Sequence, residues 1–358
     1  SLGYFYTLMT YFLGFADGDE YKVMGLAPYG EPSVDLSKII RPIDGGWDFD
    51  FSYVRQDPPV KSPFEPLYGP KLANVLGRNS RVPGDEMESF YRDLARSVQA
   101  VTEECLLSLL KSARARIPDV TNLCYAGGVA LNCSANRRVV SEAGFDTFYV
   151  SPVCSDRGLA LGCAYYGAVQ LGDKPWPLLN PYLGSSYSDD HIRQELTGNG
   201  CTFEEVEDPA ETAAGLLAEG KILGWFQGRS EAGARALGNR SIIASAETEE
   251  MRDLVNARIK YREEFRPFAP DAADKIRAVV HTDGTARLQT VRSSDNEIFY
   301  DLIRAYGAAT DVPVILNTSF NLKGQPIVET PRDALMTFFG CGLDALMLGR
   351  FLVQKPAT

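Results

Sequence analysis

The sequence is poor in histidine, in basic charge and in long apolar runs, and each shortage excludes a class of function. Only two histidines occur, His191 and His281, far apart and without another ligand beside them, so a histidine-rich metal site or a histidine-based triad is not expected. The net charge of -11 and the pI near 4.9 argue against a surface for duplex nucleic acid or anionic membrane. We therefore expect neither nucleic acid nor a membrane among the partners.

Cysteine is present but unpatterned. The seven cysteines form no CxxC motif, and an odd number cannot all pair. No signal peptide and no apolar run of about 18 residues is apparent, which predicts reduced thiols in a cytoplasmic protein.

Length and composition predict two ordinary globular domains. The chain has 358 residues, 45% of them hydrophobic and 23% charged. The segment 172–181 contains three prolines and reads as a linker. Strands and helices are interspersed on both sides of it, so the predicted class is α/β (α+β), with domains at 1–180 and 181–358.

Several regular elements follow from apolar periodicity. Phe90, Leu94, Val98, Val101, Cys105 and Leu109 recur every three to four residues and predict a helix over 87–116. Further helices are predicted at 210–219 and 249–264, and further strands at 222–226 and 288–291. Asn256, Lys260 and Glu264 would share one face of the helix at 249–264.

A strand, a glycine turn and a helix follow one another in the first domain. The strand at 122–125 leads to Gly127 and Gly128, and a helix-like segment covers 134–142. Glycines let a backbone approach a phosphate, and a helix that begins just after them presents free N–H groups to it. A Gly-Gly turn is also common without any ligand, so both readings stay open.

Asp156 follows the next predicted strand, at 147–150, and precedes a run of small residues. Aspartate at such a junction is usually a helix N-cap. A metal or nucleotide role for Asp156 needs support from outside this segment.

In the second domain, three arginines lie in a glycine-interrupted stretch after the strand at 222–226: Arg229, Arg235 and Arg240. Arginine offers bidentate, permanently charged donors, so this pattern favours a clamp for phosphate or carboxylate. A solvated surface loop, the alternative, more often uses lysine and glutamate.

The stretch 312–328 begins as an apolar strand at 312–316 and continues with hydroxyls and amides. Polar residues at a strand's end are typical of α/β binding sites, although an Asn/Ser-rich turn fits as well. The polar residues are Asn317, Thr318, Ser319 and Asn321. The candidate cations of the same domain are Arg235, Arg240, Lys260, Arg262 and Arg287. Together they predict a buried oxyanion site.

These motifs, in this order, resemble the NodU/CmcH family of O-carbamoyltransferases of nodulation-factor and antibiotic biosynthesis. The resemblance rests on EYKVMGLAPYG, YAGGVALNCSANRRV, GRSEAGARALGNRSI, IKYREEFRPFAP, DGTARLQT and VPVILNTSFNLKGQPIVETPRDAL. It implies part of an actin-like ATPase domain followed by a YrdC-like domain. In that family the YrdC-like domain splits carbamoyl phosphate, ATP adenylates the carbamate, and a metal in the actin-like domain assists transfer to an acceptor hydroxyl.

The resemblance also implies site residues and partners. The carbamoyl-phosphate site would comprise Arg235, Arg240, Lys260, Arg287, Ser319 and Asn321. Among them Lys260, Arg235, Arg287 and Ser319 would be catalytic, because cations and polar donors neutralise a phosphate leaving group. Gly127, Gly128 and Asn132 match the nucleotide loop, and Asp156 matches a metal ligand. The partners would be ATP, carbamoyl phosphate and a hydroxylated small molecule that the sequence does not name.

The chain departs from the family in two places. The family's actin-like domain begins before Ser1, and the segment between Asp271 and His281 is shorter than usual, which together predict a fragment or an incomplete chain. The metal, iron or similar, would find most ligands in that earlier part, so we expect metal binding and transfer to an acceptor to be lost or weakened here. The apolar residues of the partial domain would favour a homodimer.

Three alternatives are weighed against a carbamoyltransferase. A YrdC-like domain also serves enzymes that make threonylcarbamoyl adenylate for tRNA modification. A truncated relative could bind ATP or an anion without turning it over. An actin-like sugar kinase would leave the second domain unexplained.

Overall fold

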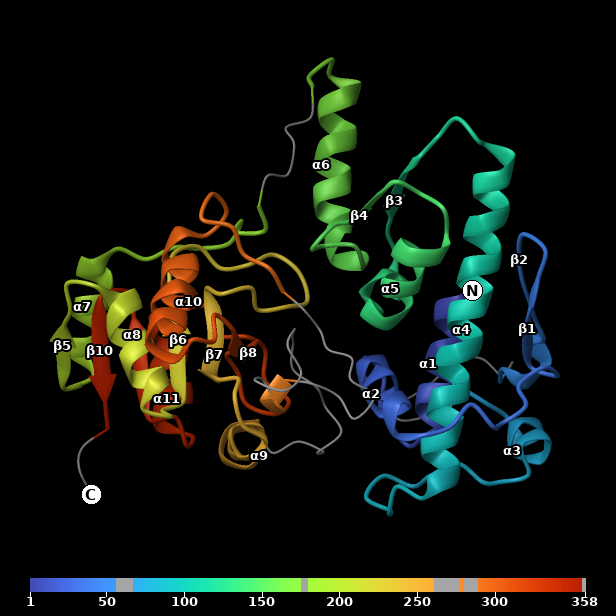
Figure 1. The fold of residues 1–358 in the computed structure, drawn as a ribbon, viewed down its shortest axis with the longest axis horizontal. Coiled ribbons are helices and arrows are strands. Elements are labelled where there is room, and N and C mark those ends of the chain that lie inside the picture. Colours follow the sequence, from blue (N-terminus) through green and yellow to red (C-terminus); the bar gives the residue numbers. More distant parts are fainter. Residues whose placement is uncertain (56–66, 175–179, 261–276, 280–288, 356–358) are drawn as a thin grey trace. The chain divides into compact units, whose positions relative to one another are not determined.

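The chain forms two compact units, Ser1–Ala160 and Leu161–Thr358, shown in the computed structural model of Figure 1. The structure describes residues 1–55, 67–174, 180–260, 277–279 and 289–355. Both units mix helices and strands, which confirms the predicted α+β class. The division at residue 180 and the actin-like and YrdC-like character of the halves stay predictions. Within the described ranges, no helix has both the length and the hydropathy that crossing a bilayer requires.

The first unit is organised around one long helix, α4 (Ser89–Arg116). Helices α1, α2 and α5 and the hairpin β1–β2 pack against it. The bounds of the surrounding elements are α1 Leu2–Phe12, α2 Glu20–Leu26, η1 Ala27–Tyr29, β1 Ile40–Ile43, β2 Gly46–Phe49, η2 Phe51–Tyr53 and α3 Pro70–Leu76. Because α4 has neighbours on several sides, its buried surface is wider than a single stripe.

The predicted helix over 87–116 is confirmed as α4, and its buried face is only partly the predicted one. Leu94, Val98 and Cys105 are fully buried, as expected. The buried surface also contains four polar side chains, Ser97, Gln99, Thr102 and Glu103. Apolar periodicity could not find these, since it scores polar residues as exposed.

Two short parallel strands complete the first unit. Strand β3 (Asn122–Tyr125) pairs with β4 (Thr147–Val150), and Tyr125 lies opposite Val150. The elements that follow these strands are η3 Gly128–Leu131, α5 Cys133–Glu142, η4 Asp156–Gly158 and α6 Leu159–Gln170, and most of α6 already belongs to the second unit. Both predicted strands and the predicted helix at 134–142 are therefore confirmed.

The second unit is a six-stranded mixed sheet with helices on both faces. The strand order is β5-β10-β9-β6-β7-β8, and β6 and β9 are parallel while the other pairs are antiparallel. The strands are β5 Phe203–Glu205, β6 Leu223–Phe226, β7 Arg240–Ser245, β8 Ile315–Ser319, β9 Ala345–Leu348 and β10 Phe351–Gln354. The helices are α7 Asp189–Gly198, α8 Pro209–Ala218, α9 Glu249–Val255, α10 Glu297–Thr310 and α11 Pro331–Phe339, with η5 Asn256–Lys260 and η6 Arg277–Val279.

Two apolar clusters cover the two faces of this sheet. The cluster that contains Ile242, Leu316 and Phe226 packs against α7, α9 and α11. The cluster that contains Ile243 and Trp225 packs against α8 and α10. Because neighbouring residues of a strand face opposite clusters, the register of each strand decides on which side its polar residues lie.

Three predictions at the edges of this unit are wrong. The strand predicted at 312–316 begins at Ile315 and runs to Ser319, so its hydroxyl and amide residues belong to the strand itself. The helix predicted at 249–264 ends as an α-helix at Val255 and continues as a π-helical turn, Asn256–Lys260, which breaks the four-residue spacing. Residues 289–291, the described part of the strand predicted at 288–291, are not in a strand.

Candidate functional site

In the first unit, the parallel pair β3–β4 brings two predicted site loops together. The loop after β3 holds Gly127 and Gly128, and the loop after β4 holds Asp156. Both leave the same edge of the pair because the strands are parallel. The Gly127 N–H donates to the carbonyl of Cys154 at 2.6 Å, which joins the two loops directly.

The backbone at the two glycines is open on one side. Gly127 has φ 108°, a conformation that favours glycine, and a Cβ on Gly127 or Gly128 would meet no atom within 4 Å. The open side gives a ligand room to approach the backbone, as the phosphate reading requires. Nucleotide binding by these glycines stays a prediction.

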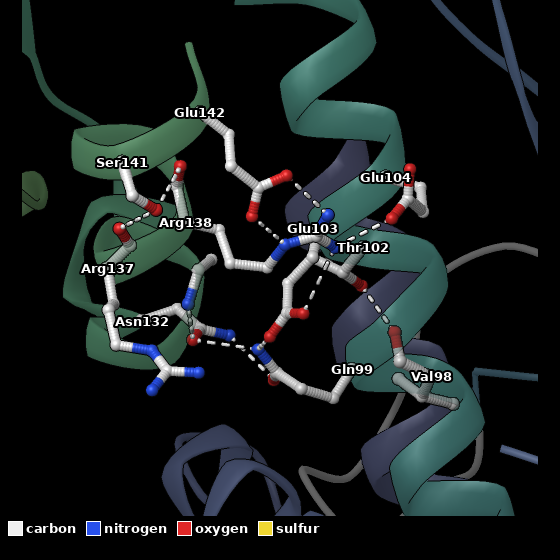
Figure 2. Close-up of polar contacts among 11 residues, drawn as sticks. Val98, Gln99, Thr102, Glu103, Glu104, Asn132, Arg137, Arg138, Ser141 and Glu142 are labelled. Atoms are coloured by element: carbon white, nitrogen blue, oxygen red, sulfur yellow. Dashed lines mark hydrogen bonds and ion pairs between the residues drawn. The ribbon is translucent and has the colours of Figure 1, made fainter. Parts of the chain in front are cut away.

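Asn132, the third predicted nucleotide residue, is buried and caps helix α5 (Figure 2). Its Oδ1 accepts from the Ala135 N–H at 3.0 Å and from Gln99 Nε2 at 3.1 Å. Its Nδ2 donates to Gln99 Oε1 at 2.9 Å. The side chain thus fixes where α5 begins, next to the glycine turn.

Gln99 is the hub of this network. Its Oε1 also accepts from the Tyr6 hydroxyl at 2.9 Å, and its Nε2 also donates to Glu103 Oε1 at 2.6 Å. Both donors and both acceptor positions of the amide are used, on a side chain that is 1% exposed. One glutamine therefore joins α1, α4 and the start of α5.

A second link ties α5 to α4 through Arg138 (Figure 2). The guanidinium makes a two-pronged contact with Glu142 at 2.7 and 2.8 Å and donates to Glu104 at 2.6 Å. Glu103 lies 3.5 Å away on the same side. Hydrogen bonding to Glu142 is the largest cause that raises the pKa of Arg138. Helix α5, which follows the glycine turn, is thus held against α4 by ion pairs as well as by neutral hydrogen bonds.

Asp156 stands apart from this network. It lies exposed in the first turn of η4, whose N-cap is Ser155. Among the described residues, no three histidine, cysteine, aspartate or glutamate side chains gather to hold a metal. One exposed carboxylate does not bind iron by itself, so the described residues do not form a metal site unless other groups supply further ligands. The role of Asp156 as a metal ligand stays a prediction.

In the second unit, the loop between β6 and β7, residues 227–239, is here called the arginine loop. Arg229 donates through Nε to Gly184 O and through Nη2 to Leu183 O, both at 2.9 Å. These contacts attach the loop to the chain segment that precedes α7. Arg229 is therefore part of the scaffold of the loop.

Arg240, the first residue of β7, is fully buried. Its guanidinium donates to four backbone carbonyls, those of Gln227, Asn239, Ser185 and Gly228, at 2.6 to 3.3 Å. Its Cζ lies 3.6 Å from the centre of the Phe226 ring. Burial lowers the pKa of Arg240 to about 10, against the opposing effect of Glu231 and Glu329. The structure thus shows Arg240 holding backbone, and its contact with carbamoyl phosphate stays a prediction.

Arg235 differs from the other two arginines. It is partly exposed, and it makes no hydrogen bond or ion pair with any residue that the structure describes. The carbonyl of its neighbour Ala236 accepts from Asn317 Nδ2 and from Gln289 Nε2, each at 3.2 Å. The tip of the arginine loop is therefore attached to strand β8.

Strand alternation decides which predicted residues share a side. Asn317 lies opposite Ile243 and Ser319 opposite Ser241, so both are on the α8–α10 face of the sheet. Arg240 lies on the other face, with Phe226. The structure therefore brings the Arg235 segment to the side of Ser319, and it does not bring Arg240 there.

Ser319 and Asn321 are in direct contact. The Ser319 hydroxyl donates to Asn321 Oδ1 at 2.7 Å, and Asn321 Nδ2 donates to Gln325 O at 2.6 Å. The Oδ1 atom of Asn317, on the same strand, is buried and has no partner within the described residues. Arg287 and the side chain of Lys260 lie outside the described residues, so their predicted roles stay predictions.

Sequence analysis missed the residues that hold these sites in place. Gln99 is the main one in the first unit, and in the second unit the sequence indicates Asn317 only as part of a polar run. A usable signal existed for Gln99, because a glutamine inside an apolar helix stripe is more often bonded than free.

Comparison with known protein families assigns the chain to a class of protein. The family model described as Carbamoyltransferase N-terminus matches residues 1–165, and the one described as Carbamoyltransferase C-terminus matches residues 214–275 and 270–355. The chain belongs to the carbamoyltransferase family, which confirms the predicted resemblance and makes it a member of a family of transferases.

Individual members of the family are similar to this chain over most or all of its length. The chain is similar to the nodulation protein NolO of Bradyrhizobium diazoefficiens, with 36% identity over all of this chain and 70% of that protein. It is 34% identical to an uncharacterized protein of Synechocystis, over all of this chain and 67% of the relative. It is 30% identical to the 3'-hydroxymethylcephem-O-carbamoyltransferase of Streptomyces clavuligerus, over 73% of this chain and 56% of that enzyme. The chain thus covers between 56% and 70% of the length of these relatives.

Proposed function

We propose that this chain uses carbamoyl phosphate as donor in an O-carbamoyltransferase reaction. The observation that carries the proposal is Arg235, a cation without a partner among the described residues, on a loop that Asn317 attaches to the polar face of β8. A guanidinium on a segment attached to the side of the sheet that carries Asn317 and Ser319 suits a phosphate bearing a small amide-like group. The family membership and the named cephem carbamoyltransferase relative support it.

The two units would divide the reaction. The second, as a YrdC-like domain, would hydrolyse carbamoyl phosphate, with one water molecule consumed, to phosphate and carbamate. The carbamate would then attack the α-phosphate of ATP and release pyrophosphate, which forms a carbamoyl adenylate. The first, as the actin-like part, would hold the nucleotide at Gly127 and Gly128, and an acceptor hydroxyl would take the carbamoyl group and release AMP. Asn132 would act by fixing the helix behind this loop.

The test is phosphate release from carbamoyl phosphate, measured with and without ATP. Arg235→Ala is expected to raise the KM for carbamoyl phosphate by about 10-fold or more, because a charge-assisted contact is lost. Lys260→Ala and Ser319→Ala are expected to abolish release. The matched control is Arg304→Ala, because the Arg304 side chain is 70% exposed on α10 and, among the described residues, pairs with Asp301 of the same helix alone.

Equal KM values for Arg235→Ala and Arg304→Ala would contradict the proposed phosphate contact. Tight binding of carbamoyl phosphate without release would favour a non-catalytic binding module. Adenylate formation that depends on bicarbonate and threonine would favour the tRNA-modification reaction.

A further inference from the structure

Glu231 makes an unusual set of contacts inside the arginine loop. Its Oε1 atom accepts from three backbone N–H groups, those of Leu237 at 2.7 Å, Asn239 at 2.8 Å and Arg240 at 3.2 Å. A carboxylate that receives several backbone N–H groups occupies the kind of concavity that otherwise binds a free anion. The N–H groups of Leu237, Asn239 and Arg240 are therefore already used and do not bind an external anion.

The same contacts close the loop into a ring. Glu231 lies near its start and the three N–H groups at its end, and Arg235 lies between them. The end is fixed further by Gly238, which has φ 99° and leaves no room for a side chain because a Cβ would lie 2.4 Å from the Phe299 ring. Asn239 Nδ2 donates to the Arg229 carbonyl at 2.7 Å.

A second carboxylate anchors the outside of the ring. Glu329 Oε1 accepts from the Ser230 hydroxyl at 2.9 Å and from the Ser185 N–H at 3.2 Å. With Arg229 and Arg240 bound to backbone carbonyls, each charged side chain of residues 229–240 except Arg235 has a partner among the residues that the structure describes. Among those residues, Arg235 is thus the charged side chain of the loop that is left for a ligand.

We propose that Glu231 is a positioning residue for Arg235, and that the closed ring holds the Arg235 guanidinium ready for the phosphate of carbamoyl phosphate. The inference rests on the proposed function. A donor that is already held in place loses little freedom when the anion binds, so closure of the ring should appear as affinity. If Glu231 served the fold alone, its removal would not depend on which residue stands at position 235.

The test is a double-mutant cycle of Glu231→Ala and Arg235→Ala, read as the Kd for carbamoyl phosphate by titration calorimetry. We expect Glu231→Ala to weaken binding by about 10-fold in the native background and by less than about 2-fold when Arg235→Ala is present. Glu231→Gln keeps an oxygen acceptor of the same reach and is expected to retain most of the affinity. It also serves as the variant to measure if Glu231→Ala does not fold.

The outcomes separate this inference from the proposed function. If Arg235→Ala weakens binding and Glu231→Ala costs the same factor in both backgrounds, Glu231 does not act through Arg235 and this inference fails alone. If Glu231→Gln loses as much affinity as Arg235→Ala while keeping its native unfolding midpoint, ring closure by the acceptor oxygen is overturned. If Arg235→Ala leaves the Kd unchanged, the proposed phosphate contact fails and this inference fails with it.

Discussion

Replacing Arg240 with methionine is expected to lower the free energy of unfolding of the second unit by about 3 kcal/mol. The substitution removes the donor for the carbonyls of Gln227, Gly228, Asn239 and Ser185, all in or beside the arginine loop. A buried acceptor left without a donor costs about 1–3 kcal/mol, and packing of the methionine against Phe226 offsets only part of the sum.

Urea unfolding at neutral pH measures this loss, and amide exchange followed by mass spectrometry assigns it to β6 and β7. Arg304→Met is the matched control, because its side chain is 70% exposed, and it should change stability by less than about 0.5 kcal/mol. If the two variants unfolded at the same urea concentration, the carbonyl contacts of Arg240 would not stabilise the unit.

Gln99→Glu is expected to destabilise the first unit by about 3 kcal/mol at neutral pH. The change keeps the shape of the side chain and turns the Nε2 donor into an oxygen. That oxygen would face Glu103 Oε1, now 2.6 Å away, and Asn132 Oδ1, now 3.1 Å away. The new oxygen would then face two acceptor oxygens with no hydrogen to share, and its negative charge would be buried beside that of Glu103.

The pH dependence has a definite sign. Burial beside Glu103 raises the pKa of the new carboxyl in the folded state above its value in the unfolded chain. The part of the penalty that comes from ionisation is therefore absent below the unfolded pKa of about 4.3 and grows as the pH rises toward the folded pKa, while one acceptor stays without a donor at every pH. The difference in unfolding free energy between native protein and variant should shrink steadily as the pH falls toward 4.

Gln99→Met provides the comparison for this pH series. It removes the same hydrogen bonds without adding a titrating group, so its difference from the native protein should vary with pH less than that of Gln99→Glu. A Gln99→Glu difference no steeper with pH than that of Gln99→Met would show that the new carboxyl does not face Glu103. Nucleotide affinity measured on both variants would report how far the start of α5 controls the glycine turn.

Much of the fold could be predicted because local signals agreed with tertiary packing. The strand at 122–125, the glycine turn and the helix after it are a short local unit, and the structure contains all three. The apolar pattern over 87–116 is strong enough to predict the helix even though polar residues also lie on its buried side. Where the pattern is strong and local, the prediction and the structure coincide.

The failures arise where long-range contacts decide. Asn317 and Ser319 look like a loop because their polar side chains favour turns, yet pairing with β7 extends the strand through them. Of three arginines that look equivalent in sequence, two bind carbonyls, and Arg235 has no such contact in the part of the chain that the structure describes. That distinction depends on backbone from residues 183–185, which no pattern within the loop contains.

The order of strands in the second unit bears on how the protein is made. Central strand β6 pairs with β9, and the bond from Ile222 N–H to Asp344 joins residues 122 positions apart. During synthesis β6 and β7 therefore leave the ribosome long before the partner that covers β6. Such non-local pairing slows folding and leaves apolar strand edges uncovered in the meantime. Strands β3 and β4, by contrast, are separated only by η3 and α5, so their pairing is far more local in sequence.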